Sequence, residues 1–389
     1  MTWVLAGEHV VRYTHQCMIN HPTLTQRAEA EQALSSTQFQ KICLGIDWHA
    51  DQYRVVRIID NGGPEPAQRF TPEEFLKWAK KQTRLAWQVY SCYEAGAGGY
   101  YLHRQLLAEE VLNYVVAPRK LDRQNKGVVT DKTDARELAY DLSRYVNGHT
   151  KALCVVRAPT PEQEQARCES RQREQLKEHL QSMAAQGRSL LLTQGYRRKG
   201  RWWKLKEWEY FLAHFNPPAW LVERLELWRS LIVQIDEKLD ALTCRIEAAA
   251  PTVLPVGLGK LTFENVRREV LQWDRFHNRK GPGSYAGLVG GVSASGPYHR
   301  DLSLTKAGNG RLRSTLVEAA WRMLFYQPKS KLVQKHAKVL FNPKAGRAAR
   351  KRMIVAMARQ LFIDLWRWQT GQVSPKELGW QMMQPMLPS

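Results

Sequence analysis

Four carboxylates in the first third of the chain could together hold hard metal ions. Asp47 ends one apolar run, Glu94 follows a second, and Asp131 and Asp134 lie at the start of a predicted helix. Their spacing of three places the last two on one helical face. Mg²⁺ prefers oxygen ligands, and two such ions can stabilise both oxygens of a phosphodiester displacement. Each residue alone could be solvated, or cap a helix as Asp131 could, but the joint pattern predicts a Mg²⁺ site.

The partner predicted by the overall charge is a polyanion. The 389 residues carry a net charge of +21, and the pI is near 9.8. Such a balance favours nucleic acid, where neutralised phosphates release counterions. A membrane surface is the competing partner, but the sequence shows no apolar run of 18 residues and no signal-peptide pattern. We therefore expect a cytoplasmic protein without a membrane partner, whose six scattered cysteines are reduced thiols.

The elements around the carboxylates predict an α/β domain. Strands are expected over 42–46, 53–59, 86–92, 111–116 and 152–156, and helices over 98–109 and 131–147. A further helix should begin after Thr71, with Glu74 completing a capping box. Two strands followed by alternating strands and helices indicate a mixed sheet covered by helices, as in a ribonuclease H-like fold. Such a sheet could gather the four carboxylates along one edge.

A seam of apolar residues marks the middle of the chain. Its members follow one another at alternating steps of four and three: Leu221, Leu225, Trp228, Ile232, Ile235, Leu239, Leu242 and Ile246. This heptad pattern favours a coiled coil, formed either with another protomer or with the preceding helix, which is predicted over 162–192. Packing of one helix on the core of its own domain is the alternative.

The predicted boundaries divide the chain into four parts. Residues 1–40 form an N-terminal extension, 41–158 the α/β domain and 159–250 a helical coiled-coil domain. Residues 251–389 form a mostly α-helical C-terminal domain, with glycine-rich interruptions at 257–259 and 281–296.

Basic residues interleaved with aromatic ones predict contacts to nucleic acid. In the segment 196–206 the candidates are Arg197, Arg198, Lys199, Arg201, Trp202, Trp203 and Lys204. The cations suit phosphates and the indoles suit stacking on unpaired bases, so we assign this segment to RNA. Core packing by the tryptophans is the alternative. Lys306, Arg311 and Arg313 are further candidates, although basic runs are usually solvated surface.

Several of these motifs resemble those of a transposase family. Gly45-Ile-Asp-Trp-His, Tyr93-Glu-Ala-Gly and Thr130-Asp-Lys-Thr-Asp-Ala-Arg are similar to motifs of the DEDD transposases of 110/1111-type insertion sequences. That family also holds pilin gene-inverting proteins. The resemblance implies a RuvC-like, ribonuclease H-type resolvase domain in which Asp47, Glu94, Asp131 and Asp134 bind Mg²⁺.

A second block of the chain resembles the C-terminal transposase domain of the same family. It comprises Ser295-Gly296 and the run from Leu304 to Arg313. The resemblance implies that Ser295 is a nucleophile forming a covalent phosphoserine link to DNA, with Ser293 as the neighbouring alternative. It also implies a structured guide RNA, the bridge RNA, that pairs with donor and target DNA. The family's assembly implies a homo-oligomer, a dimer or tetramer, in which the serine domain of one protomer completes the acidic site of another.

Two other functions fit parts of the pattern. A Mg²⁺-dependent nuclease similar to Holliday-junction resolvases would use the acidic site without a covalent step and would not need Ser295. A non-catalytic RNA-binding scaffold would explain the charge but not the four carboxylates. The sequence therefore predicts an RNA-guided DNA recombinase first and a nuclease second.

Overall fold

The computed structural model describes residues 38–117 except 97, and residues 131–383 except 296 and 297. The side chains of 131–133, 292–299 and 301 also lie outside the description, as does nearly all of the predicted N-terminal extension. The chain forms two compact units, residues 1–158 and 159–389.

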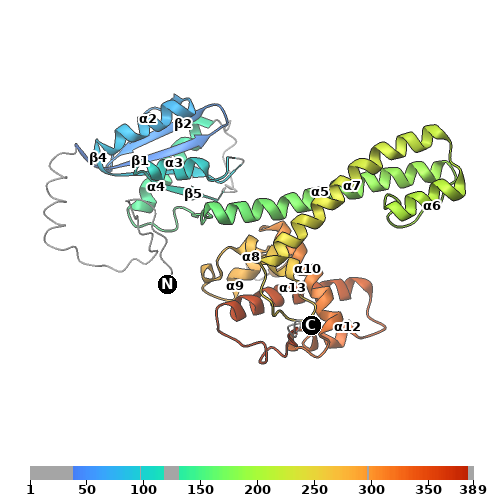
Figure 1. Cartoon of the computed structure of the whole chain (residues 1–389). Coiled ribbons are helices and arrows are strands. Elements are labelled where there is room, and N and C mark those ends of the chain that lie inside the picture. Colours follow the sequence, from blue (N-terminus) through green and yellow to red (C-terminus); the bar gives the residue numbers. More distant parts are fainter. Residues whose placement is uncertain (1–37, 97, 118–130, 296–297, 384–389) are drawn as a thin grey trace. The chain divides into compact units, whose positions relative to one another are not determined.

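A five-stranded mixed sheet forms the centre of the first unit (Figure 1). Its spatial order is β3 (Gln68–Phe70), β2 (Tyr53–Ile59), β1 (Phe39–Trp48), β4 (Ala86–Glu94) and β5 (Leu112–Val116). β1 pairs antiparallel with β2 and parallel with β4, and β4 pairs parallel with β5. The predicted mixed α/β sheet is confirmed.

The two faces of this sheet are covered by different helices. Ile42, Leu44 and Ile46 of β1 pack in one core cluster with residues of α2 (Pro72–Thr83) and α3 (Tyr101–Ala108). Cys43, from the opposite face of the same strand, packs with α4 (Asp131–Val146). This alternation follows from the two-residue period of a strand. The predicted capping box at the start of α2 is confirmed, since Thr71 and Glu74 satisfy each other's backbone N–H groups.

The strand expected over 152–156 is wrong. Val155 forms only an isolated bridge with Val116, although the Val156 N–H donates to the Val115 carbonyl over 2.7 Å. Ala152 and Leu153 are buried whereas Cys154 and Val155 are exposed, so burial along this segment does not alternate as it does in a regular strand. An irregular pairing satisfies its backbone without a regular ladder.

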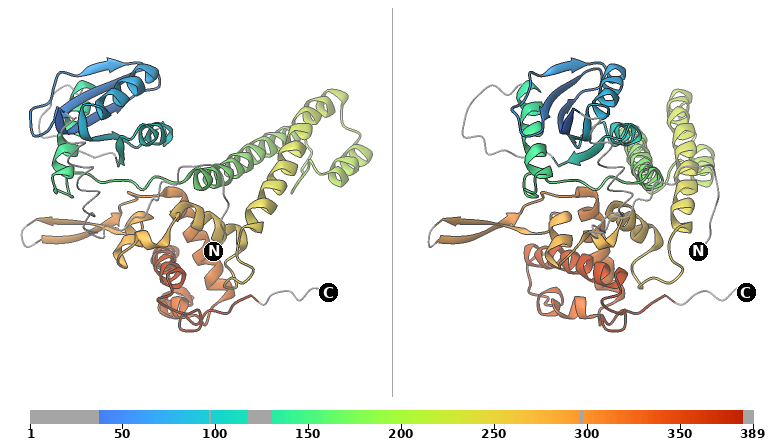
Figure 2. Two further views of the ribbon diagram at one scale, coloured as in Figure 1. Left: turned by 60° about the vertical axis from the view of Figure 1, so that its left-hand side comes forward. Right: turned by 90° about the vertical axis from the view of Figure 1, so that its left-hand side faces the viewer.

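A long helical arm begins the second unit (Figures 1 and 2). It consists of α5 (Pro161–Thr193), α6 (Leu205–Phe215) and α7 (Ala219–Ala248). Leu221, Leu225 and Ile232 of the heptad seam are buried in one cluster with Leu180 and Ala184 of α5. Of the alternatives left open by the sequence, the structure shows the seam packed against the preceding helix of the same chain.

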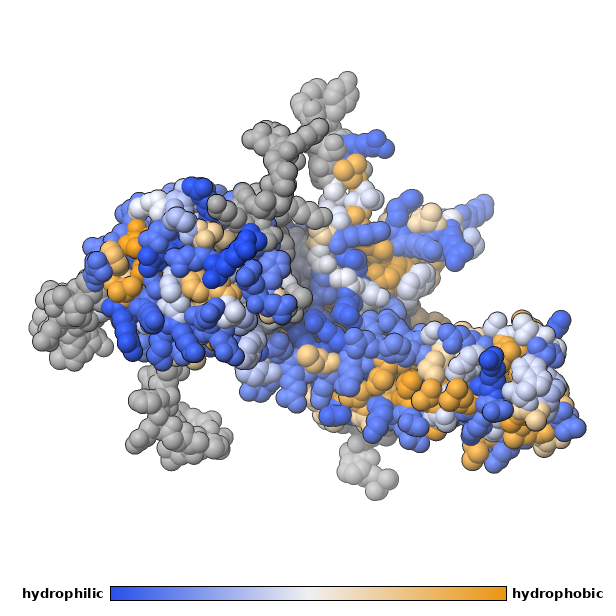
Figure 3. Space-filling view, turned by 90° about the horizontal axis from the view of Figure 1, so that it is seen from above, coloured by the Kyte–Doolittle hydropathy of each residue, from blue (hydrophilic) through white to orange (hydrophobic). Residues whose placement is uncertain are grey.

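Apolar side chains also reach the surface of this arm. Trp220, Leu227 and Leu231 of α7 are exposed, and Figure 3 shows apolar patches along the arm between hydrophilic neighbours. These residues lie outside the heptad seam, so packing against α5 does not account for them.

The rest of the second unit is mostly helical, as predicted. Its elements are α8 (Lys260–Val270), a 3₁₀ turn (Trp273–Arg275), α9 (Lys280–Tyr285), β6 (Gly290–Ser295), β7 (Tyr298–Leu304), α10 (Gly310–Tyr326), α11 (Lys331–Gln334), α12 (Ala337–Leu340) and α13 (Arg347–Gln369). Leu316, Met323 and Leu361 belong to its core, where α10 packs on α13.

The antiparallel hairpin of β6 and β7 differs from the prediction. A glycine-rich interruption was expected there, whereas the structure shows a two-stranded ribbon that projects from the helical body (Figure 2). Within the part of the chain described here, no helix is long and apolar enough to cross a bilayer.

Candidate active site and nucleic-acid interface

Asp47 and Glu94 lie at the carboxyl ends of two neighbouring parallel strands. Ile46 of β1 pairs with Tyr93 of β4, so the residues that follow them are neighbours across the sheet. Cys92 faces α4, because its thiol donates to the Leu138 carbonyl over 3.4 Å. Strand alternation puts Glu94 on this same face, and by the same reasoning from Cys43 it puts Asp47 there as well.

Helix α4 covers that face directly above β1. A Cβ atom at Gly45 would lie 2.2 Å from the Ala135 carbonyl oxygen and 2.3 Å from the Ala139 nitrogen. Only glycine allows a helix to approach a strand this closely. The half-buried Asp134 therefore lies in a turn of α4 that packs beside the strand carrying Asp47.

The four predicted metal ligands are thus brought together to different degrees. Asp47, Glu94 and Asp134 come to one face and one end of the sheet, while the side chain of Asp131 lies outside the described part. Among the side chains that are described, no group of three His, Cys, Asp or Glu residues is close enough to hold a metal ion. The donor set suits Mg²⁺ chemically, and the complete four-carboxylate site stays a prediction.

One neighbour of the acidic site was not predicted. The Nε2 atom of His49 lies 3.5 Å from the Oδ2 atom of Asp47, whose side chain is only 19% exposed. The sequence signal is the spacing of two, which places both side chains on one side of an extended backbone. An imidazole at this position could orient the carboxylate.

The loop after Glu94 is held against the end of β1. A Cβ atom at Gly98 would lie 2.4 Å from the Trp48 ring, so the loop backbone rests on the indole. The Tyr93 hydroxyl donates to the Gly99 carbonyl over 3.0 Å. These contacts fix the chain on both sides of Glu94.

Ser295 is the last residue of β6 and pairs with Tyr298, while Ser293 pairs with Arg300. The side chains of both serines and the residues 296–297 between the strands lie outside the described part. The choice between the two hydroxyls therefore stays open. The structure places Ser295 on an extended strand and not, as predicted, in a glycine-rich loop.

The segment after β7 anchors the base of this hairpin. A Cβ atom at Gly308 would lie 2.6 Å from both the Gly287 nitrogen and the Tyr285 carbonyl oxygen. Asn309 caps α10 by accepting from the Leu312 N–H over 3.0 Å, and its amide donates to Glu269 over 2.6 Å. The Gly-Asn pair therefore has a structural purpose.

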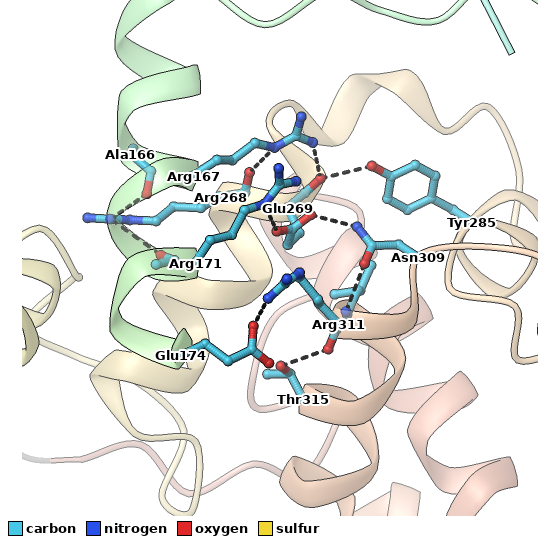
Figure 4. A network of polar contacts seen from close by, with 12 residues as sticks. Ala166, Arg167, Arg171, Glu174, Arg268, Glu269, Tyr285, Asn309, Arg311 and Thr315 are labelled. Atoms are coloured by element: carbon cyan, nitrogen blue, oxygen red, sulfur yellow. Dashed lines mark hydrogen bonds and ion pairs between the residues drawn. The ribbon is translucent and has the colours of Figure 1, made fainter. Parts of the chain in front are cut away.

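The basic residues of this segment have different environments. The Arg313 guanidinium donates to the carbonyls of Ala286 and Lys306 over 3.0 and 3.3 Å. Arg311 forms an ion pair with Glu174 of α5 (Figure 4). These partners explain both arginines without nucleic acid, whereas Lys306 is exposed. Contact of all three with nucleic acid stays a prediction.

A network of buried charges joins the arm to the helical body (Figure 4). Arg167 of α5 donates to the backbone carbonyls of Arg268 and Glu269 over 2.9 and 2.7 Å. Arg268 in turn donates to the Ala166 carbonyl over 2.8 Å and bridges to Glu169 over 3.1 Å. Since these groups satisfy one another, the root of α5 is held firmly on α8.

The stacking role predicted for Trp202 and Trp203 is not supported. The two residues are only 2% and 5% exposed and pack in the core of the arm. The Trp202 indole donates to the Ala184 carbonyl over 3.0 Å, and a Cβ atom at Gly187 would lie 2.1 Å from its ring. Core packing, the alternative left open by the sequence, accounts for both residues.

The cations around these indoles divide into two groups. Arg198 forms an ion pair with Glu207 over 2.6 Å and lies over the Tyr210 ring. Lys204 forms an ion pair with the buried Asp236 over 2.7 Å. Burial alone would raise the pKa of Asp236, but hydrogen bonds from Lys204 and Trp203 lower it below its usual value. The exposed members of the predicted set are Arg197, Lys199, Arg201 and the ion-paired Lys204.

Comparison with known proteins adds evidence independent of this geometry. The model of the family described as "Transposase IS116/IS110/IS902 family" matches residues 256–334, which run from just before α8 to the end of α11 and include the hairpin with Ser295. A protein of Sinorhizobium fredii named as a transposase, y4rJ, is 30% identical over 325 residues, covering 77% of this chain and 82% of its own length. The chain belongs to the IS116/IS110/IS902 family of transposases.

Two further relatives agree with this membership. A second protein of Sinorhizobium fredii named as a transposase, y4qE, is 31% identical over 240 residues, or 60% of this chain and 58% of the relative. The transposase for insertion sequence element IS1533 of Leptospira borgpetersenii is 25% identical over 349 residues, or 84% of this chain and 95% of the relative. Similarity to transposases thus extends over both units of this family member.

Proposed function

We propose that this family member is an RNA-guided DNA recombinase that moves an insertion sequence in the cytoplasm. Its catalytic groups would be a Mg²⁺-binding acidic site and the Ser295 hydroxyl. The observation that carries the proposal is the register of β1 and β4, which makes Asp47 and Glu94 neighbours beneath the helix that bears Asp131 and Asp134. Carboxylates gathered at the end of a mixed sheet suit phosphodiester chemistry on a polyanion.

In this proposal the four carboxylates and Ser295 would have different roles. Asp47, Glu94, Asp131 and Asp134 would hold Mg²⁺, which when bound stabilises negative charge on phosphoryl oxygens. The Ser295 oxygen would form a bond to phosphorus, and the bond from phosphorus to the leaving deoxyribose oxygen would break. The serine hydroxyl loses its proton to a base and the leaving oxygen gains one. One phosphoester bond replaces another, so reversal of the step rejoins DNA.

The guide RNA and the assembly are parts of the same proposal. The net charge of +21 supports a polyanionic partner, and the exposed Arg197, Lys199 and Arg201 are the candidate RNA contacts. A homo-oligomer, dimer or tetramer, is supported by the exposed apolar side chains of α7.

The acidic site is tested by changing one carboxylate to its amide. Asp47→Asn and Glu94→Gln should abolish strand cleavage and leave RNA binding near that of the unchanged protein, because the fold keeps its shape while the metal loses a charged ligand. Asp51→Asn is the matched control, since Asp51 is an exposed carboxylate just beyond β1. Cleavage by Asp47→Asn at the rate of the control would remove the acidic site from the proposal.

The covalent step is tested with Ser295→Ala. A nicked DNA substrate should trap a protein–DNA adduct in the unchanged protein, and mass spectrometry of the digest should locate it on Ser295. The alanine variant should lose the adduct and recombination together while it still binds DNA and RNA, because one hydroxyl contributes little to a phosphate-dominated interface. An adduct on Ser293 would move the nucleophile by two residues. Full strand cleavage by the alanine variant would place the protein among the nucleases.

A further inference from the structure

A cavity of about 1050 Å³ lies at the base of the β6–β7 hairpin, against α13. Its lining includes Leu302 and Leu304 of the hairpin and a strip along α13. The hairpin residues that line the cavity, Leu302 and Leu304 among them, belong to the part of the hairpin whose side chains the structure describes. The volume is at the upper end of the range for cavities that bind small ligands, so a few nucleotides would fit and a duplex would not.

One face of α13 supplies a regular alternation of cationic and apolar side chains to this cavity. Lys351, Val355, Arg359, Ile363 and Arg367 follow one another at a spacing of four, and all five line it. A spacing of four places them along one side of the helix.

The charge of the lining is of one sign. Arg279, Lys306, Lys335 and Arg352 also line the cavity, and no Asp or Glu is among its described lining residues. Asp364 lies on α13 but is buried and accepts a hydrogen bond from Gln360 over 2.8 Å. A cavity with cations and an apolar wall suits a ligand that combines phosphates with flat apolar rings.

Two buried nitrogen atoms at this cavity have no hydrogen-bond partner among the residues described. Trp366 is only 5% exposed, and its indole N–H has no hydrogen-bond partner among the residues described. The buried Nε2 atom of His336, which donates or accepts according to the ring tautomer, also has no partner among these residues. Both residues line the cavity. A buried donor without a partner is unfavourable, and an acceptor on a bound ligand would satisfy it.

We propose that this cavity binds a short unpaired segment of a polynucleotide. A base enters against the apolar wall, accepts a hydrogen bond from the Trp366 indole and forms one with the His336 imidazole, while its flanking phosphates contact Lys351 and Arg359. The site does not depend on Ser295 or on the acidic residues, so Asp47→Asn and Ser295→Ala should bind such a segment like the unchanged protein.

The first experiment removes one N–H from the cavity. Fluorescence anisotropy would measure binding of short single-stranded DNA and RNA oligonucleotides, each with a matched strand that lacks one base. Trp366→Phe should weaken binding of the base-containing strand about fivefold, as expected for one lost hydrogen bond, and leave the abasic strand unchanged. Trp380→Phe is the control, because Trp380 is also 5% exposed with an unpartnered indole N–H among described residues but does not line the cavity.

The second experiment removes charge from the strip. Arg359→Gln should weaken binding of both the base-containing and the abasic strand, and Arg347→Gln, at the exposed start of α13 outside the cavity, should not. The oligonucleotide bound more tightly, DNA or RNA, identifies the source of the segment. Equal effects of Trp366→Phe and Trp380→Phe, or tighter binding of duplex than of unpaired strand, would overturn the proposal.

Discussion

The burial of a single residue in this protein cannot always be predicted from its neighbours in the sequence. Trp202 and Trp203 stand between arginines and lysines, a setting typical of a nucleic-acid surface, yet both indoles are buried. The deciding partner is Gly187, more than ten residues away on α5, whose missing side chain leaves room for the Trp202 ring. No local pattern shows such a contact. By contrast, the capping box of Thr71 and Glu74 was predictable because both partners lie within four residues.

Gly45 allows a prediction at this scale. Gly45→Ala should destabilise the first unit by roughly 1–3 kcal/mol, because the new methyl group meets backbone atoms of α4 that cannot move without shifting the helix. Since α4 bears Asp131 and Asp134, strand cleavage should fall as well. Chemical denaturation would measure the loss, with Gly63→Ala as the control, because a Cβ atom at Gly63 meets nothing within 4 Å. Equal stability of the two variants would contradict the packing of α4 on β1.

Elements with a strong period were predictable, and weakly patterned ones were not. The strands before Asp47 and Glu94 and the long helices carry clear apolar periods, so their order and the neighbouring strand ends that carry these two residues were predictable from the sequence. The complete four-carboxylate site stays a prediction. The β6 strand reads Gly290-Gly-Val-Ser-Ala-Ser, in which apolar and polar residues alternate over only four small side chains after two glycines, too weak a signal to predict a strand. The pairing of β6 with β7 depends on backbone hydrogen bonds, and the pattern of side-chain types does not predict them.

The heptad seam gives a prediction for one element against its neighbour. Ile232→Asp should unfold the α5–α7 pair at a cost above about 3 kcal/mol, because Ile232 is 0% exposed and the carboxylate would have no partner prepared for it. Leu231→Asp changes the adjacent residue, which is 42% exposed, and should leave the pair folded. Hydrogen exchange of α5 and α7 amides in the full chain would separate the two. Protection of α5 that survives Ile232→Asp would show that the seam does not hold the arm together.

At the scale of the whole molecule, charge should dominate binding. With a net charge of +21, the logarithm of the binding constant for RNA should fall linearly with the logarithm of salt concentration. Lys199→Gln should make this slope shallower by about one, if the exposed lysine neutralises a phosphate. Titrations at several salt concentrations would measure both slopes. A slope that does not change in Lys199→Gln would remove this segment from the nucleic-acid interface.

The charged root of α5 has a mechanical consequence. Arg167 and Glu174 tie the first half of this helix to α8 and to the start of α10, and the remaining residues to Thr193 extend roughly 30 Å beyond them at the usual helical rise. The helix is therefore anchored near its N-terminal end by hydrogen bonds and an ion pair, and it can pivot about these contacts. A force on α6 at its far end would act as torque on Arg311 and on the Glu269–Asn309 bond, which flank the loop leading back to the β6–β7 hairpin. A small rotation of α5 about these contacts would displace its C-terminal end, near Thr193, by a much larger distance.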